Sequence, residues 1–395
     1  MRKGAIPLPQ HVDLEELRSW RRHLHQHPEL SFEEHETTAY IEGYLRSLGL
    51  EPVRKTETGL WADIQGAHPG PTVAIRADID ALPIEEQTDL PFRSQKPGVM
   101  HACGHDGHTS ILMGVAREFL ARRQDLKGRI RLLFQPAEET PPGGAQLLIQ
   151  AGALEGVDAV IGLHLIPAFP TGKASIVAGP MMAASDRFVL EVVGKGGHGA
   201  SPHETVDALA IAAQMVTAAQ QVVSRQVDPL EPAVVTFGTF HAGSNFNIIA
   251  QEARLTGTVR TFSEGTRQLI EGSLERIFQG MAQAYGAKVR LDYRRGYPAL
   301  VNHPYVTDVF IEAVKEILGP EGYIPGRPVM GGEDFAYYLQ QKPGAFLFLG
   351  CGNPAEGAIY PNHHPSFTID EKALPLGVDV LVRTAEKLLA HPPRG

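Results

Sequence analysis

Positions 100–108 read MHACGHDGH and place three histidines, a cysteine and an aspartate within nine residues. Such side chains are poor material for a hydrophobic core, because every buried polar group needs a hydrogen-bond partner. Cys103 and His105 are two apart in a glycine-containing stretch, so a thiolate and a neutral imidazole can converge on one cation. This segment therefore predicts a binding site, and a metal is a natural ligand for it.

Further polar side chains follow predicted strands elsewhere in the chain. Open α/β sheets place ligands beyond the carboxyl ends of their strands, so these residues are expected to gather there. In YPNHHPSF, His363 and His364 stand between two prolines, which predicts a rigid loop that carries two histidines. The candidates are Asp78 and Asp80 in RADIDALP, Glu138 and Glu139 in QPAEE, His164 in GLHL, and His363 with His364.

The adjacent carboxylates Glu138 and Glu139 indicate hydrolysis. Neighbouring side chains cannot point the same way, so one can ligate a metal while the other carries a proton. Sulfur, nitrogen and oxygen donors together favour zinc, manganese, cobalt or nickel over magnesium or calcium. Each cluster alone has an ordinary structural explanation; their joint occurrence at strand ends favours a site.

Composition bounds the remaining possibilities. The chain has 395 residues, 43% of them hydrophobic, which is enough for two domains. Its formal charge of −9 and lack of a long basic run disfavour nucleic-acid and membrane partners, so we expect a small molecule or peptide. The N-terminus has no continuous apolar segment, and Cys103 and Cys351 are the only cysteines, which predicts a cytoplasmic protein.

The elements that must position these residues follow from periodicity. TVAIRAD, RIRLLFQ and DAVIGLHL are short β-rich runs, and an amphipathic stretch around residues 111–119 separates the first two. This alternation predicts an α/β architecture, a central sheet flanked by helices. The string SFEE suggests a capping box from Ser31 to Glu34 ahead of a helix that stops at Gly49.

The middle of the chain has a different order of elements. Strand, helix, two strands, helix and strand succeed one another, which is the β-α-β-β-α-β pattern of a ferredoxin-like module. We place this module at 181–294, inserted into an α/β domain formed by 1–180 and 295–395.

The motifs together resemble the M20 metallopeptidase family, in the subgroup of N-acyl-amino-acid amidohydrolases, hippurate hydrolases and related carboxypeptidases. The resemblance covers nearly the whole chain. It implies a catalytic α/β domain holding two divalent metal ions and an inserted lid that also forms a homodimer. The motifs are HPELSFEEHET, RADIDALP, MHACGHDGHTS, FQPAEE, GLH, GKGGHGASPH, GTVRTF, GGEDFAYY and HHPSF, in that order.

The resemblance also implies roles in the catalytic domain. Glu138 would be the general base and Asp78 a support for the site from outside the ligand set. Arg76 stands where another branch has a metal-ligating histidine, so Cys103 and His105 would take over part of the metal binding. From the residues themselves, His101, Asp106 and His108 stay open between orienting His105 or the metals and ordinary loop hydrogen bonding. The implied metal ligands are Cys103, His105, Glu139, His164 and His363.

In the lid, His198 matches a histidine that reaches into the partner subunit's site and stabilises the oxyanion. Arg260 and Asn247 match residues that hold a substrate carboxylate, a task suited to a planar guanidinium. Ala250 replaces the family's usual proline after NII. The GGEDF segment, 331–335, is expected to have a supporting role.

The sequence thus predicts a dimeric metal-dependent enzyme that releases an amino acid from an N-acyl amino acid. A carboxypeptidase or dipeptidase is the close alternative, and a tetramer is a second possible assembly. A thiol hydrolase with Cys103 as nucleophile leaves Glu138, Glu139, His164 and His363 unexplained. A non-catalytic metal-binding protein is the rival from another class.

Overall fold

The protein is described by a computed structural model covering residues 12–393. Residues 1–11, on which the expectation of a missing leader depends, lie outside the described part, as do 394–395. The chain forms two compact units. The first comprises Met1–Gly179, Val301–Arg327 and Asp334–Gly395, and the second comprises Pro180–Leu300 and Pro328–Glu333. The second unit contains the segment 181–294; its role as a lid stays a prediction.

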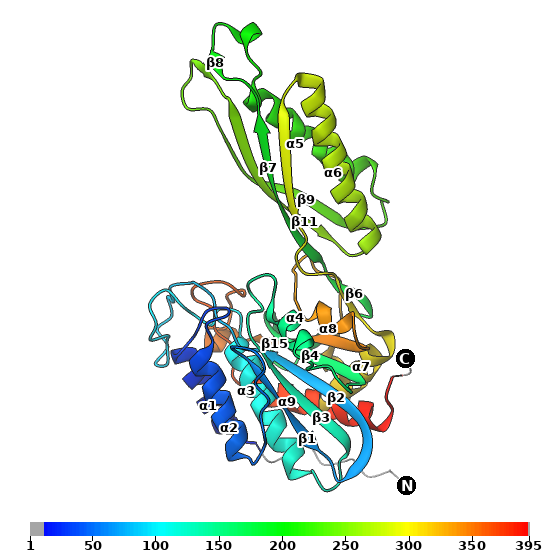
Figure 1. Ribbon diagram of the computed structural model, residues 1–395. Helices are drawn as coiled ribbons and strands as arrows, with labels where there is room; N and C mark the ends of the chain where they lie inside the picture. The colour runs from blue at the N-terminus through cyan, green and yellow to red at the C-terminus, as the bar shows by residue number, and fades with distance from the viewer. Residues whose placement is uncertain (1–11, 394–395) are drawn as a thin grey trace. The chain divides into compact units, whose positions relative to one another are not determined.

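The first unit is built on a seven-stranded sheet with the order β1-β3-β2-β4-β15-β5-β14 (Figure 1). Neighbouring strands β3, β2, β4 and β15 run parallel, and β1 joins β3 antiparallel. The strands are β1 (Leu60–Gln65), β2 (His68–Asp78), β3 (Lys127–Gln135), β4 (Ala159–Pro170), β5 (Ala174–Ile176), β14 (Tyr323–Pro325) and β15 (Gly344–Gly352).

Helices flank this sheet, which confirms the predicted α/β class. α3 and α9 pack against each other and against β2, while α4 contacts β3 and α8 contacts β15. The helices are α1 (Leu14–Gln26), α2 (His35–Ser47), α3 (His105–Ala121), α4 (Gly144–Gln150), α7 (Pro304–Leu318), α8 (Ala336–Leu339) and α9 (Ala373–Ala390). Short 3-10 turns lie at Pro320–Gly322 and Pro354–Glu356, and β6 (Gly179–Met182) and β13 (Leu300–Asn302) lie where the chain passes between units.

The second unit has the β-α-β-β-α-β order read from the sequence. Its antiparallel sheet has the order β12-β7-β11-β9, and α5 and α6 cover one face (Figure 1). Phe188, Leu190 and Val192 of β7 point into the core under these helices. The elements are β7 (Ala184–Val193), α5 (Ala208–Arg225), β9 (Ala233–Ala242), β11 (Glu252–Thr261), α6 (Glu264–Tyr285) and β12 (Lys288–Arg294), with the short β8 (Gly197–His198), β10 (Ile248–Ile249) and a 3-10 turn at Pro202–Glu204.

The capping box predicted at Ser31–Glu34 is wrong, although the helix it introduced is present. α2 begins at His35 without a side-chain cap. The Ser31 hydroxyl donates to Asp80 Oδ2 at 2.7 Å, and Glu34 Oε1 accepts from the Ala137 amide at 2.7 Å. Both side chains therefore support the strand-end loops, a use that local spacing does not reveal. No helix among residues 12–393 is long and apolar enough to cross a membrane.

Candidate metal centre and active site

The predicted donors of the first unit converge after the ends of its central strands. Cys103 Sγ groups with His105 and His164, and it also groups with Glu139 and His363, the donor atoms of each trio lying within 4.8 Å of one another. Cys103 is thus common to two adjoining sets of potential ligands. A further group joins His105 with Glu138 and Glu139. The five residues expected as ligands are therefore gathered in one place.

His105 is buried at the start of α3 and is held by Asp80, whose Oδ1 lies 3.1 Å from His105 Nδ1. Its other nitrogen, Nε2, has no hydrogen-bond partner among residues 12–393, although Glu139 Oε1 is 3.8 Å away. Burial alone would lower the pKa of His105, but the Asp78 and Asp80 carboxylates raise it to about 10. The position therefore favours a positive charge, which a metal ion can supply in place of the proton.

Cys103 has the opposite electrostatic preference. Burial raises the pKa of this thiol well above its usual range, and the neighbouring Glu139 and Glu138 carboxylates raise it further. A thiolate at this position needs a cation beside it, because an unpaired buried anion is costly. The environment therefore disfavours Cys103 as an independent nucleophile and suits it as a ligand.

His164 is oriented by its own strand. Its Nδ1 donates to the Leu165 carbonyl at 2.9 Å, so Nε2 presents its lone pair at 3.3 Å from Cys103 Sγ. Burial lowers the pKa of His164 well below its ordinary value, and His108 lowers it further. A neutral imidazole aimed at the cluster is the form that binds a metal.

The two histidines of HHP, His363 and His364, make different contacts. His363 adopts a left-handed backbone with φ 68°, its amide donates to the Ala102 carbonyl at 2.7 Å, and its Nε2 lies 3.2 Å from Glu139 Oε1. His364 instead accepts from the Ser366 amide through Nδ1 and stacks on Tyr360 at 4.4 Å between ring centroids. Only His363 joins the donor cluster.

The Glu138–Glu139 pair is set by a strained turn after β3. Ala137 has φ 50°, a left-handed conformation that costs free energy for a residue with a Cβ. The Glu139 amide donates to Asp80 Oδ2 at 3.0 Å. Asp80 therefore fixes His105 and the Glu139 backbone together, and the turn aims both glutamates at the cluster.

Asp78 supports the site along a different path from Asp80. Its Oδ1 lies 2.6 Å from His108 Nδ1, and its Oδ2 accepts from Arg76 Nη1 at 2.8 Å. His105 Nε2 is more distant, 3.5 Å from Asp78 Oδ2. Arg76 also donates to Asp334 Oδ1 at 2.9 Å, which gives the second acidic residue of GGEDF a structural contact.

Asp80 was a candidate from the sequence, but sequence reasoning gave it no role as a supporting residue. The signal was present in RADIDALP, where two aspartates alternate along one extended segment. Asp106, by contrast, faces Arg21 Nε at 3.0 Å and His25 Nδ1 at 2.9 Å, so it does not orient His105. His101 has no hydrogen-bond partner for its ring nitrogens in the described part of the chain, and burial lowers its pKa to about 4.

The three functional residues predicted in the second unit do not all lie close together. His198 of β8 pairs with Ile248 of β10, and the Gly199 amide donates to the Asn247 carbonyl at 2.8 Å. Arg260 pairs with Ser185 at the other end of β11. Arg260 lies eight residue steps along the extended strand from Glu252, roughly 26 Å. The unit therefore brings His198 and Asn247 together but not Arg260.

These features define a class of protein: a two-unit α/β protein with a buried cluster of sulfur, nitrogen and oxygen donors suited to a cation, beside carboxylates able to move a proton. The chain belongs to peptidase family M20/M25/M40, whose model matches residues 74–387.

Relatives with assigned names are similar over most of their length. An N-acyl-L-amino acid amidohydrolase of Geobacillus stearothermophilus is 52% identical over 72% of this chain and 77% of its own. A thermostable carboxypeptidase of Saccharolobus solfataricus is 42% identical over 92% of this chain and 94% of its own. A Bacillus subtilis protein described as a dinuclear metal-binding M20 peptidase has a crystal structure with TM-score 0.82, 37% identity and coverage of 95% and 98%.

Proposed function

We propose that this protein is a metal-dependent amidohydrolase that hydrolyses N-acyl amino acids to a free amino acid and a carboxylic acid. The observation that carries this proposal is the sharing of Cys103 between two donor trios, with Glu138 placed beside one of them. The relation to an N-acyl-L-amino acid amidohydrolase at 52% identity supports the substrate class.

The cluster fits a pair of divalent ions by the chemistry of its donors. His105 Nε2 is buried and lacks a hydrogen-bond partner among the residues described, as expected for an atom reserved for a metal, and Glu139 Oε1 lies 3.2 Å from His363 Nε2. Cys103, His105 and His164 would hold one ion, and Cys103, Glu139 and His363 the other. Zinc, manganese, cobalt or nickel bound there would supply Lewis acidity for the carbonyl and lower the pKa of the attacking water.

The protein's own residues would move the proton and hold the substrate. Glu138 takes a proton from the attacking water and returns it to the leaving amine. His198 donates to the oxyanion that develops on the former carbonyl oxygen. Arg260 binds the free carboxylate of the amino-acid part, with Asn247 as a second contact, so that the scissile amide is held in place.

A homodimer is part of the proposal, because one second unit cannot bring its His198 and Arg260 to the same substrate. The separation along β11 suits an arrangement in which the two residues serve different sites. Phe246 and Ile248, next to Asn247, are 97% and 50% exposed, an apolar surface suited to contact with a second copy. A tetramer built from such dimers is the larger alternative.

A metallo-carboxypeptidase or dipeptidase is the second candidate, because a relative at 42% identity bears the name carboxypeptidase. Both reactions use a free carboxylate beside the scissile amide. We also propose a cytoplasmic location, since Cys103 and Cys351 are both buried and free.

A substrate panel tests this proposal. Purified protein is assayed with N-acetyl and N-benzoyl amino acids and with dipeptides, before and after chelation and after readdition of manganese, cobalt, zinc or nickel. We expect chelation to abolish amino-acid release and readdition to restore it, with acyl amino acids hydrolysed faster than dipeptides. Faster dipeptide cleavage would favour the peptidase, and activity that survives complete metal removal would refute the mechanism. Bound metal with no turnover of any substrate would favour a binding protein.

A further inference from the structure

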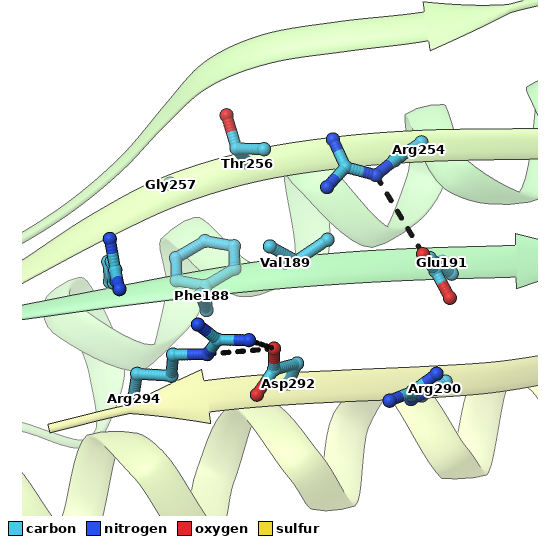
Figure 2. A pocket seen from close by; sticks show the side chains of 10 residues that line it. Phe188, Val189, Glu191, Arg254, Thr256, Gly257, Arg290, Asp292 and Arg294 are labelled. Carbon is cyan, nitrogen blue, oxygen red and sulfur yellow. Dashed lines mark hydrogen bonds and ion pairs between the residues drawn. The ribbon is translucent and has the colours of Figure 1, made fainter.

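An arginine-lined hollow lies on the open face of the second unit's sheet, outside the site described above (Figure 2). We call it the arginine groove. Its volume is about 480 Å³, within the range of small-molecule sites. It is lined by Arg187, Phe188, Val189 and Glu191 of β7, Arg254, Thr256 and Gly257 of β11, and Arg290, Asp292 and Arg294 of β12.

The groove faces away from the helices because strands alternate their side chains. Phe188 and Leu190 of β7 point into the core formed with α5 and α6, so Arg187 and Val189 point to the opposite face. In Figure 2 the helices lie behind the sheet and the charged side chains stand on the near side. No described element of this unit covers the residues around Arg187, Arg254, Arg290 and Arg294, which are all exposed.

The groove has more positive than negative side chains. Asp292 Oδ2 accepts from Arg294 Nε at 2.9 Å and from Nη2 at 2.7 Å, while Glu191 Oε1 lies 3.7 Å from Arg254 Nε. Arg187 and Arg290 form no ion pair with any residue in 12–393. The bond from Arg294 lowers the pKa of Asp292, and Arg290 and Arg187 lower it further, so several cations surround one carboxylate. The four arginines therefore outnumber the two carboxylates, Glu191 and Asp292, by two charges.

The strand register makes this excess costly to the folded protein. Arg187 and Arg294 are direct cross-strand partners in the β7–β12 pair, on the same face. Like charges directly opposite each other destabilise a sheet. The chain as a whole has a net charge of −9, so a general excess of basic residues does not account for this pair. An anion between the two guanidinium groups would remove the repulsion.

The close packing of the sheet beneath the groove depends on a glycine. A Cβ at position 257 would lie 2.2 Å from Phe188 Cζ and 2.4 Å from the Thr236 carbonyl oxygen. The β11–β9 register also shifts between Thr256 and Gly257. Gly257 therefore leaves room for the Phe188 ring on the core side of the sheet, and Val189 contributes an apolar side chain to the hollow among the arginines.

We propose that the arginine groove binds a small anion with at least two negative charges, of phosphate or polycarboxylate chemistry. Guanidinium groups match the planar and tetrahedral oxygens of such ligands and can contact two oxygens at once. A second copy of the chain presenting the same face would be repelled by its charge, and the volume of the hollow suits a small ligand. The proposal is independent of the function assigned to the metal cluster, because none of these residues belongs to it.

The test uses the metal-loaded full chain and two probes, sulfate as an analogue of phosphate and tricarballylate as a polycarboxylate. Thermal unfolding is followed across a titration of each probe, with ionic strength kept constant by potassium chloride. A ligand that binds the folded protein raises Tm in a saturable manner. We compare the wild type with Arg187→Gln and Arg294→Gln, and with Arg225→Gln as control. Arg225 is exposed at the end of α5, so this variant loses the same charge away from the groove.

We expect a saturable rise in Tm for the wild type and the Arg225→Gln control with at least one probe. The apparent Kd should be roughly tenfold weaker in Arg187→Gln and Arg294→Gln, as expected for loss of a charged hydrogen bond. In chloride alone Arg187→Gln should unfold at a higher temperature than the wild type, because the like-charge pair is gone. A response to sulfate alone would identify phosphate-type ligands, and a response to tricarballylate alone polycarboxylates.

Three results would each overturn the proposal. The first is the lack of a saturable response to either probe in the wild type. The second is an unchanged response in both Arg187→Gln and Arg294→Gln. The third is an equal loss of response in Arg225→Gln, which would show a general effect of net charge.

Discussion

At the scale of single residues, side chains of the same chemical type in the site differ in the groups that they contact. Glu139 faces His363 and the cation cluster, and its backbone is tied to Asp80. Glu138 is the adjacent residue, and it shares a donor group with His105. Asp80 contacts both the His105 ring and the Glu139 amide, whereas Asp78 contacts His108 and Arg76. Two residues of the same type, such as Glu138 and Glu139, therefore have different roles because their side chains make different contacts.

Replacing Glu138 with Gln should stop catalysis and leave metal binding intact. The amide keeps the size of the carboxylate but cannot accept the proton of water, so kcat should fall by about 10²–10⁴-fold. Metal content by atomic emission and kcat by amino-acid release are the two measurements. Glu139→Gln is the matched control, and it should lower metal content. A Glu138→Gln variant with nearly normal turnover would remove Glu138 from the role of base.

Replacing Asp80 with Asn should weaken metal binding, although Asp80 is not itself a proposed ligand. Loss of the carboxylate frees the His105 ring and loosens the Glu139 turn, and such supporting residues typically contribute 10–100-fold in metal affinity. Competition with a chromophoric chelator measures the change. Asp89→Asn is the control, since Asp89 is exposed nearby along the chain. Equal affinity in the two variants would contradict the positioning role.

At the scale of elements, the packing of α3 against α9 buries acidic groups as well as apolar ones. Glu118 of α3 is buried, accepting from the Val12 amide at 3.1 Å and from Arg122 Nη2 at 3.3 Å. Asp379 of α9 has a pKa raised to about 7 by burial and by the charge of Glu118. The helix pair therefore has a pH-sensitive contact at some distance along α3 from His105, the first residue of that helix.

Asp379→Asn should reduce the dependence of stability on pH. The folded pKa lies above the unfolded value, so the wild type loses stability as pH rises from about 4 to about 7, while the neutral amide does not. Because Asp379 is partly exposed, we expect the variant to gain about 2 kcal/mol or less at pH 8 and little at pH 4. Urea unfolding across this range measures it. Asp308→Asn, at an exposed position of α7, is the control; a constant offset at every pH would refute the assignment.

At the scale of the whole molecule, the two units carry different sets of candidate functional residues. The first gathers the cation-binding donors at the ends of parallel strands. The second places His198 and Asn247 at one end of its sheet, Arg260 at the other, and the arginine groove on the face between its edges. A dimer in which His198 serves the partner's site reconciles these positions with one substrate.

Mixing two inactive variants tests this dimer. Glu138→Gln and His198→Ala homodimers should each be nearly inactive, but a mixed dimer would have one site with both native residues. Random exchange should then restore about a quarter of wild-type activity, because half of the dimers are mixed and each has one complete site. Exchange is verified separately with differently tagged chains. No recovery after verified exchange would place His198 at the site of its own chain.

The sequence alone determined the α/β class, the β-α-β-β-α-β order and the clusters of candidate donors after the strands, and the resemblance to the M20 family selected five of these candidates as ligands. The class and the order follow from local periodicity, and the gathering of the clusters follows from the rule that strand ends in a parallel sheet meet at one edge. Tertiary structure decided that Asp80 holds His105, that His364 turns away from His363, and that Ser31 and Glu34 serve loops instead of a helix cap. It also decided that Arg187 and Arg294 face each other. Such choices depend on the direction of turns and on strand register, which bring together groups distant in sequence.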